Sequence, residues 1–356
     1  MSFRPNQFRA LREPGEYREG RWRRFEPPAP VAWTLCGRQV WLRPGLTFTP
    51  YANPTPCNAH CSFCSEELLR VDASRLTAKT LIGDFDRYFD GLERCWAELA
   101  GFEAGLSLSG LEATSDAGWL LRLLGLVQRH GALFPSRVLY TNGSGLVNDA
   151  RLIPALRGAG FTGVELSRAH FDPKRNHLVM RFARGEAIRE AGAFGEVVTR
   201  VLEAGLPLKL VCIVNRQGVS SLAGVERYVD EARALGVRRV VFRALSELGS
   251  LYGDNRTARW ISTHQVPLAG VLESIFPAEG APRTGWRFVG VTSGYYYSNE
   301  LYERDGVEVV FESASYVAHE EAVRGEVFQK LVFHSTGELG GDWVPGSRHI
   351  GRYLTP

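Results

Sequence analysis

The chain has 356 residues, of which 44% are hydrophobic and 23% charged. These are ordinary values for a globular protein, so they exclude extensive disorder, and the length suits one large α/β domain or two smaller ones. The net charge of +3 does not indicate a dedicated nucleic-acid binder. No apolar run reaches the roughly 18 residues that span a bilayer. The arginine-rich N-terminus has no apolar stretch like that of a signal peptide, which predicts a cytoplasmic protein without a membrane partner.

The first 45 residues are predicted to form a basic arm and then a hairpin that turns at Gly37. From Leu46 onward, short β-rich runs alternate with longer segments of helical period, which is typical of βαβ units around a parallel sheet. The expected strands cover residues 46–51, 105–110, 137–143, 163–168, 208–214 and 238–245. The expected helices cover 77–100 and 257–276, with others beginning at Ser115, Asp149, Gly185 and Ser221.

This alternation predicts an α/β protein in three parts. An N-terminal arm and hairpin (1–45) precedes six βα units (46–277), and a C-terminal extension (278–356) follows. The extension is expected to be mostly β, with strand-like stretches beginning at Trp286, Val307 and Lys330, and to cap the substrate site.

Three cysteines lie within eight residues, in CNAHCSFC, in the loop expected after the first strand: Cys57, Cys61 and Cys64. Thiolates at this spacing can converge from one loop. Zinc would need a fourth ligand, and His60 is adjacent to Cys61, so the two side chains would seldom face one tetrahedral ion. Iron–sulfur clusters are usually bound by four cysteines, so three leave one iron open for chemistry. We favour the cluster, with zinc as the alternative. The other cysteines are expected to be small buried hydrophobes: Cys36, Cys95 and Cys212.

With Phe63 before its last cysteine and its place after the first strand of a βα series, CNAHCSFC resembles the motif of radical S-adenosylmethionine (SAM) enzymes. The resemblance covers about residues 46–245. It implies a partial (β/α)6 barrel of the TIM type, in which Cys57, Cys61 and Cys64 bind a 4Fe-4S cluster and SAM chelates the open iron. In that family one electron cleaves SAM, and the 5′-deoxyadenosyl radical takes hydrogen from the substrate. An external one-electron donor, such as flavodoxin or ferredoxin, is then implied.

The same resemblance suggests residues that bind the cofactor. Gly110 and Glu112 match part of a Gly-Gly-Glu-Pro motif that holds the SAM amino group. Asn142 ends the third strand, where an ordinary Asn-Gly turn is equally compatible. Arg168 is the first choice for the SAM carboxylate, because a fixed guanidinium suits such a group. The predicted cofactor-binding set is Phe63, Gly110, Glu112, Asn142, Ser167, Arg168 and Asn215.

Two further side chains are candidates for catalysis. His170 follows the fourth strand and is expected to contact substrate or to act as an acid or base; a solvated loop position is the alternative. Arg243 lies in an otherwise apolar strand and needs a partner if it is buried. That partner is either an anionic group of the substrate or a structural carboxylate such as Glu165.

No cysteine follows Cys212, so no auxiliary cluster is expected in the C-terminal extension, and the residues before the first strand are too few for a cobalamin domain. The favoured substrate is a small polar natural-product intermediate, namely a sugar, nucleoside or nucleotide sugar, with Tyr295, Tyr296 and Tyr297 as pocket walls. One alternative is modification of a ribosomal peptide that docks on the hairpin. Outside the family, the alternative is a zinc-binding protein without turnover.

Overall fold

The computed structural model describes residues 28–68, 81–249, 255–277 and 283–354. The strands before residue 250 are β1 (Val31–Leu35), β2 (Arg38–Tyr51), β3 (Gly105–Leu108), β4 (Ser136–Thr141), β5 (Gly163–Ser167), β6 (Leu208–Val214) and β7 (Arg239–Ala244). Those after it are β8 (Trp286–Ser293), β9 (Tyr297–Arg304), β10 (Val307–Ala314), β11 (Val327–His334), β12 (Glu338–Gly340) and β13 (His349–Arg352). The helices are α1 (Ser65–Leu68), α3 (Phe85–Glu98), α4 (Ala117–Arg129), α5 (Ser144–Asn148), α6 (Leu152–Gly158), α7 (Pro173–Met180), α8 (Ala191–Glu203), α9 (Leu222–Ala234), α10 (Arg256–His264), α11 (Leu268–Ile275) and α12 (Tyr316–Val323).

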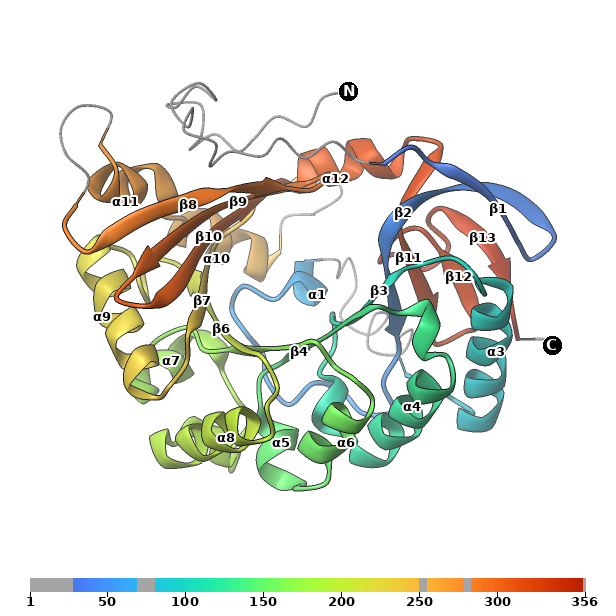
Figure 1. Cartoon of the computed structure of the whole chain (residues 1–356), viewed down its shortest axis with the longest axis horizontal. Helices are drawn as coiled ribbons and strands as arrows, with labels where there is room; N and C mark the ends of the chain where they lie inside the picture. The colour runs from blue at the N-terminus through green and yellow to red at the C-terminus, as the bar shows by residue number, and fades with distance from the viewer. Residues whose placement is uncertain (1–27, 69–80, 250–254, 278–282, 355–356) are drawn as a thin grey trace.

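The strands form one sheet, in the order β13-β12-β11-β2-β3-β4-β5-β6-β7-β10-β9-β8, with β1 paired to β2. All neighbours from β11 to β10 are parallel, whereas the strands beyond them are antiparallel. Figure 1 shows the sheet as an open arc, with α4, α6, α8 and α9 along its outer side and α12 crossing above the opening. The predicted α/β fold, a partial barrel with a β extension, is confirmed.

The six predicted strands all form because their apolar residues alternate between two environments. On β6, Leu208, Leu210 and Cys212 belong to the apolar core, whereas Lys209 and Ile213 line the interior of the arc. Such alternation follows from the two-residue period of a strand. It lets one set of side chains pack on the helices while the other set faces the site.

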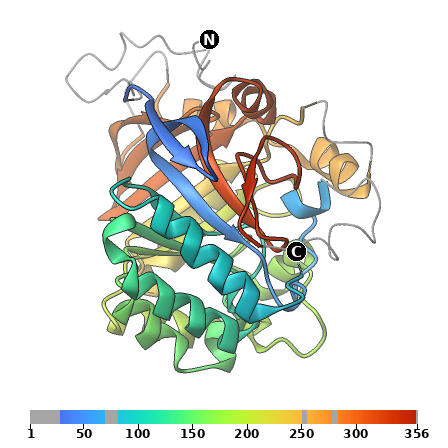
Figure 2. The same cartoon turned by 90° about the vertical axis from the view of Figure 1, so that its right-hand side faces the viewer.

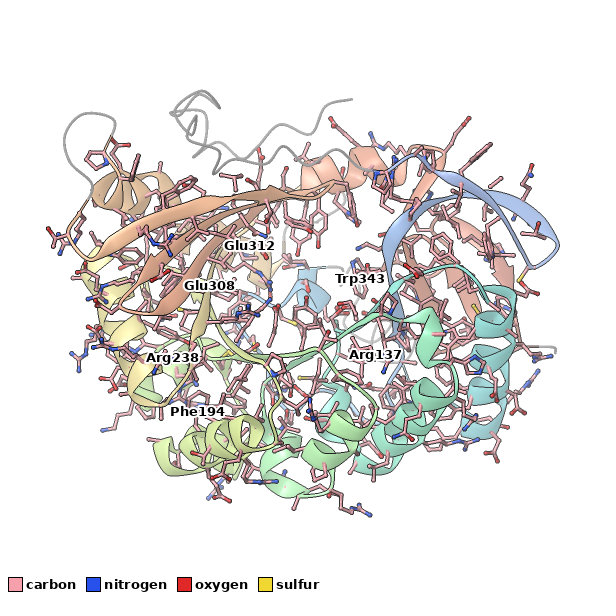
Figure 3. The ribbon with its side chains drawn as sticks, in the orientation of Figure 1. Arg137, Phe194, Arg238, Glu308, Glu312 and Trp343 are labelled. Atoms are coloured by element: carbon pink, nitrogen blue, oxygen red, sulfur yellow. The ribbon has the colours of Figure 1, made fainter. Side chains whose placement is uncertain are left out.

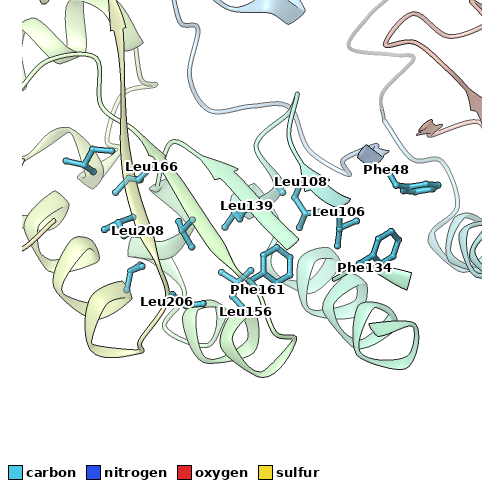
Figure 4. Close-up of a cluster of buried hydrophobic side chains, with 14 of the residues drawn as sticks. Phe48, Leu106, Leu108, Phe134, Leu139, Leu156, Phe161, Leu166, Leu206 and Leu208 are labelled. Carbon is cyan, nitrogen blue, oxygen red and sulfur yellow. The ribbon is translucent and has the colours of Figure 1, made fainter. Parts of the chain in front are cut away.

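The main core lies between the strands and the outer helices. Figure 4 shows strand residues such as Leu106, Leu139 and Leu166 in one apolar layer with Phe134 and Leu156, all of which are buried. A fully buried Leu or Phe side chain contributes about 1.5–3 kcal/mol to stability. This layer therefore fixes the strand positions on which the site depends.

The C-terminal extension does not form a separate layer but continues the sheet at both edges. Strand β10 pairs in parallel with β7, and β11 pairs in parallel with β2. Figure 2 shows β11 beside the N-terminal hairpin, as the pairing requires. Helix α12 connects β10 to β11 and so links the two ends of the arc.

Some details differ from the expected elements. The helix expected from Gly185 begins as α8 only at Ala191. The hairpin turns at Cys36 and Gly37, which have positive φ angles of 49° and 70°, but its second strand runs without a break from Arg38 to Tyr51 across the expected boundary at residue 45. The expected helix 257–276 is two helices, because Pro267 caps the second one. Residues 77–80 of the expected helix 77–100 lie outside the described residues. No helix in the described ranges is long and apolar enough to cross a membrane.

Candidate functional site

The cysteine loop follows β2 and is held against the segment at the end of α7. Ser62 N–H donates to Val179 O (2.9 Å), and Ala183 N–H donates to Asn58 O (2.8 Å). Helix α1 begins immediately after Cys64. The loop is therefore anchored by backbone bonds on one side and by a helix at its end, which gives its thiols defined positions.

All three thiols of the motif, those of Cys57, Cys61 and Cys64, line one cavity and form no disulfide. Burial, with a further contribution from Glu112, raises the pKa of Cys57 to about 12. Burial and the neighbouring thiols Cys64 and Cys57 likewise raise the pKa of Cys61. Thiolates in these positions need a cationic partner, which iron would supply.

This donor set fits an iron–sulfur cluster better than a single ion. Within the residues that the structure describes, no group of three or more His, Cys, Asp and Glu side chains is arranged to hold one metal ion, and His60 is exposed. A four-iron cluster takes one thiolate at each iron, so the thiolates need not meet at one point. Three cavity-lining thiols from one loop would hold such a cluster and leave one iron without a protein ligand.

Glu112 is a buried carboxylate that joins the ends of β3 and β4. Its oxygens accept hydrogen bonds from Asn142 N–H (2.6 Å), the Thr141 hydroxyl (2.7 Å) and the Thr114 hydroxyl (2.6 Å). Burial raises the pKa of Glu112 even though these donors oppose the rise. The carboxylate is thus engaged by protein donors and also lines the cavity.

Asn142 connects this carboxylate to the cysteine loop. Its side-chain amide nitrogen donates to Asn58 Oδ1 (2.8 Å) and lies 3.9 Å from Cys57 Sγ.

Gly110 lies just beyond the end of the neighbouring strand, β3. It has a φ of 96°, and a Cβ atom there would lie 2.6 Å from the Tyr51 ring. Only glycine fits at this point.

The cavity has a volume of about 2780 Å³ and is lined by strands from β2 to β11, the cysteine loop and α12. A single-ligand pocket usually has about 300–1,000 Å³. This space therefore has room for a cofactor and a substrate together. The three tyrosines expected to wall a pocket are part of its lining: Tyr295, Tyr296 and Tyr297.

Four charged side chains form a network on the cavity wall. Lys209 Nζ lies 3.1 Å from Glu165 Oε1. Arg243 binds Glu312 through its Nε atom, and its Nη2 atom lies 3.8 Å from Glu165 Oε2. Figure 3 shows Glu312 on the β10 side of the central opening. Of the two kinds of partner considered for Arg243, the structural carboxylate is present: Glu165, as expected, and Glu312 in addition.

Most of the predicted site residues come together at the cavity, while three lie elsewhere. Phe63, Gly110, Glu112, Asn142, Ser167 and Arg243 line the cavity with the cysteines. The lining does not include Arg168, His170 or Asn215. Arg168 is buried with its guanidinium 4.2 Å from the centre of the Phe194 ring. His170 Nδ1 accepts a hydrogen bond from Asp172 N–H (2.9 Å), at the start of α7.

A second polar group in the cavity was not predicted from the sequence. It consists of Lys330 on β11 and His319 on α12, which line the cavity, and of their neighbour Asp342 after β12, which does not; all three are buried. His319 Nε2 lies 3.2 Å from Asp342 Oδ1. The one available signal was a lysine inside the apolar stretch KLVF, which needs a partner or a ligand when it is buried.

No protein-family model and no curated protein sequence matches the chain. Among solved structures, Streptococcus suis SuiB bound to S-adenosylmethionine is 12% identical with a TM-score of 0.50, over 89% of this chain and 65% of that chain. Native anSMEcpe with bound AdoMet is 13% identical, with a TM-score of 0.48, over 86% and 77%. Coproporphyrinogen III oxidase (HemN) from Escherichia coli, a radical SAM enzyme, is 15% identical, with a TM-score of 0.45, over 65% and 50%.

The fold is that of the radical SAM enzymes, as the cysteine motif predicts, and such enzymes recur among the similar structures. The chain spans about three fifths of the length of the SuiB chains that it matches. At these identities the likeness concerns the fold.

Proposed function

We propose that this chain is a radical SAM enzyme that removes hydrogen from a small polar substrate. The observation that carries the proposal is the placement of three loop thiols, those of Cys57, Cys61 and Cys64, on the wall of one large cavity, within a fold shared with a SAM-bound protein. When bound, the 4Fe-4S cluster and SAM supply one-electron cleavage of SAM and hydrogen abstraction, while the protein supplies orientation.

The chain's own residues would hold and enclose these groups. The three cysteines would bind the cluster, and the cavity-lining members of the predicted cofactor set would contact SAM: Phe63, Gly110, Glu112, Asn142 and Ser167. The Glu112 hydrogen bonds would keep the strand ends in place. An external one-electron donor would be needed. Roles for Arg168, His170 and Asn215 stay predictions.

For the substrate we propose a sugar, nucleoside or nucleotide sugar. Tyrosine side chains and a charged network in the same cavity support this choice, because ring faces pack on sugars or bases and polar groups bind hydroxyls. Arg243 is proposed to contribute polar contacts at its exposed edge while it stays paired to Glu312. Modification of a ribosomal peptide is the alternative outcome in the experiments below.

The cofactor part is tested by anaerobic reconstitution with iron and sulfide. The protein should be brown, with absorption near about 400 nm from cysteine-ligated iron, and after reduction it should convert SAM to methionine and 5′-deoxyadenosine. Cys57→Ala, Cys61→Ala and Cys64→Ala should each lose both properties. The matched control is Cys212→Ala, because Cys212 is fully buried on β6, away from the loop. A colourless protein with stoichiometric zinc, or loss of the cluster in Cys212→Ala, would refute the proposal.

The substrate part is tested with deuterated candidates. The reduced enzyme is incubated with SAM and deuterated sugars, nucleosides or nucleotide sugars, and label is followed into 5′-deoxyadenosine by mass spectrometry. Transfer from one of these compounds supports the proposal. Transfer only from a peptide would overturn the substrate class and leave the cofactor proposal intact.

A further inference from the structure

Lys330 is a buried cation that faces the cavity. Only 5% of the residue is exposed, and it contributes to the cavity lining from β11. Its Nζ atom lies 4.5 Å from the centre of the Trp343 ring and 5.6 Å from that of Tyr296. Figure 3 shows Trp343 across the central opening from Glu312. Two aromatic rings therefore hold the ammonium in position and favour its charged form.

Lys330 differs from the cations of the charged network in its partners. Lys209 and Arg243 each have a carboxylate within salt-bridge distance. Within the described ranges, Lys330 Nζ has neither a salt bridge nor a hydrogen bond to the protein. The nearest charged partner is Asp342, whose Oδ1 atom already binds His319 Nε2 (3.2 Å) and Trp343 N–H (2.8 Å). A buried cation in this situation is costly unless another anion approaches it.

His319 supplies a second polar atom next to Lys330. The residue is 3% exposed and lines the same cavity. While Nε2 binds Asp342, Nδ1 is buried without a hydrogen-bond partner among the described residues. The rings of Tyr295 and Tyr296 lie 6.0 Å and 5.5 Å from the His319 ring. His319 and Lys330 thus share the Tyr296 ring as a neighbour, and after burial the charge of Lys330 further lowers the pKa of His319.

We propose that Lys330 and His319 form a subsite that binds an anionic group of the substrate, either a carboxylate or a phosphate. The identification of this anion as part of the substrate rests on the proposed function. The cations of the network are already paired with Glu165 and Glu312. Of the other cations on the described cavity wall, Arg324 lies 3.8 Å from Glu320 and Arg43 is half-buried and donates to Pro28 O, whereas Lys330 is buried without a carboxylate in salt-bridge distance. Tyr296 is near both the subsite and the charged network: its ring contacts Lys330, and Glu312 adds to the burial that raises the pKa of Tyr296.

The protonation of Lys330 makes the subsite measurable. Burial lowers the pKa of Lys330 to about 7, although Asp342 opposes this. The titratable groups that face it are Asp342, His319 and Tyr296. A bound anion favours the ammonium form. If it raises the pKa by about one unit, the fraction of free amine at pH 7 falls about fivefold.

The test is carbamylation of the full-length, reconstituted protein by cyanate at pH 7, with the modification of each lysine followed by peptide mass spectrometry. Sodium sulfate and sodium benzoate serve as tetrahedral and carboxylate probes, and sodium chloride keeps the ionic strength equal. At least one probe should slow the modification of Lys330 about fivefold, while Lys209, which is paired to Glu165, should change little.

The outcomes distinguish the two anions and test the proposal. Protection by sulfate alone indicates a phosphate group, and protection by benzoate alone indicates a carboxylate. If neither probe slows Lys330 more than Lys209, the subsite is refuted. If the probe slows carbamylation of Lys330 equally in the His319→Gln variant, His319 is not part of the subsite. Because carbamylation needs no SAM cleavage, these results do not depend on whether the proposed radical reaction occurs.

Discussion

Removal of the Glu112 carboxylate should both destabilise the protein and disturb the cysteine loop. Glu112→Ala would leave the buried Asn142 N–H without its acceptor at 2.6 Å. The hydroxyls of Thr114 and Thr141 would also lose an acceptor, but they lie 3.3 Å apart and can bond to each other. The backbone N–H of Asn142 has no such substitute, nor has that of Thr114, which donates to the same carboxylate (3.1 Å), so these two groups dominate the cost.

The expected magnitude follows from this difference. A hydrogen bond to a charged group contributes about 1.5–3 kcal/mol, and an unsatisfied buried donor costs about 1–3 kcal/mol. With partial rescue of the two hydroxyls, Glu112→Ala should lower the free energy of unfolding by about 4 kcal/mol. Glu112→Gln keeps one oxygen but places an N–H₂ group where an acceptor is needed. It should therefore lower the free energy of unfolding by about 2 kcal/mol.

The assay is urea unfolding followed by tryptophan fluorescence, together with the iron content after reconstitution. Both Glu112 variants should bind less iron, because Asn142 connects Glu112 to Asn58 in the cysteine loop. The control is Glu93→Ala, whose carboxylate is 43% exposed and pairs with Arg129; a change below about 1 kcal/mol is expected there. Equal, small effects in all three variants would refute the reasoning.

Three other changes test the rest of the cavity. Arg243→Met should lower the free energy of unfolding in urea by about 3 kcal/mol, because it leaves Glu312 unpaired; no loss would contradict the ion pair. Gly110→Ala should cost about 1–3 kcal/mol in the same assay, from its left-handed φ and the Tyr51 ring; a neutral result would argue against this backbone. For Lys330 the folded pKa of about 7 lies below the ordinary 10.5, so stability should rise with pH between these values. Lys330→Met should abolish that rise in stability, measured by urea unfolding from pH 7 to 10. An unchanged rise would show that another group causes the pH dependence.

Much of the fold could be predicted because strands and helix starts depend on residues close in sequence. Strand β6 occupies the expected residues 208–214, and Ser221 caps α9 as its position before an amphipathic segment indicates. The strand order at the edges could not be predicted. Pairing of β10 with β7 and of β11 with β2 depends on backbone bonds between segments far apart in the chain, which leave no local pattern.

The site residues, too, could be predicted where the signal is local in sequence and could not where it depends on distant segments. The CNAHCSFC spacing is local, so the three cysteines could be singled out. Arg168 was chosen for a carboxylate because of its residue type, but its position depends on the ring of Phe194 on α8, against which its guanidinium packs. The partner of Arg243 on β10, Glu312, could not be chosen among many carboxylates before the strand order was known. Lys330 and His319 were missed for the same reason.

Lys330 and the paired cations of the network thus have different expected consequences for stability. Lys209 and Arg243 are balanced by Glu165 and Glu312, so their charges chiefly hold the strands β5, β6, β7 and β10 together. Lys330 has aromatic neighbours instead of a carboxylate, so its burial opposes folding. A residue that costs stability in this way is most readily understood if it binds a ligand. Neutral replacement should therefore weaken the structure at Arg243 but strengthen it at Lys330 near neutral pH, and the opposite signs would argue against the anion subsite.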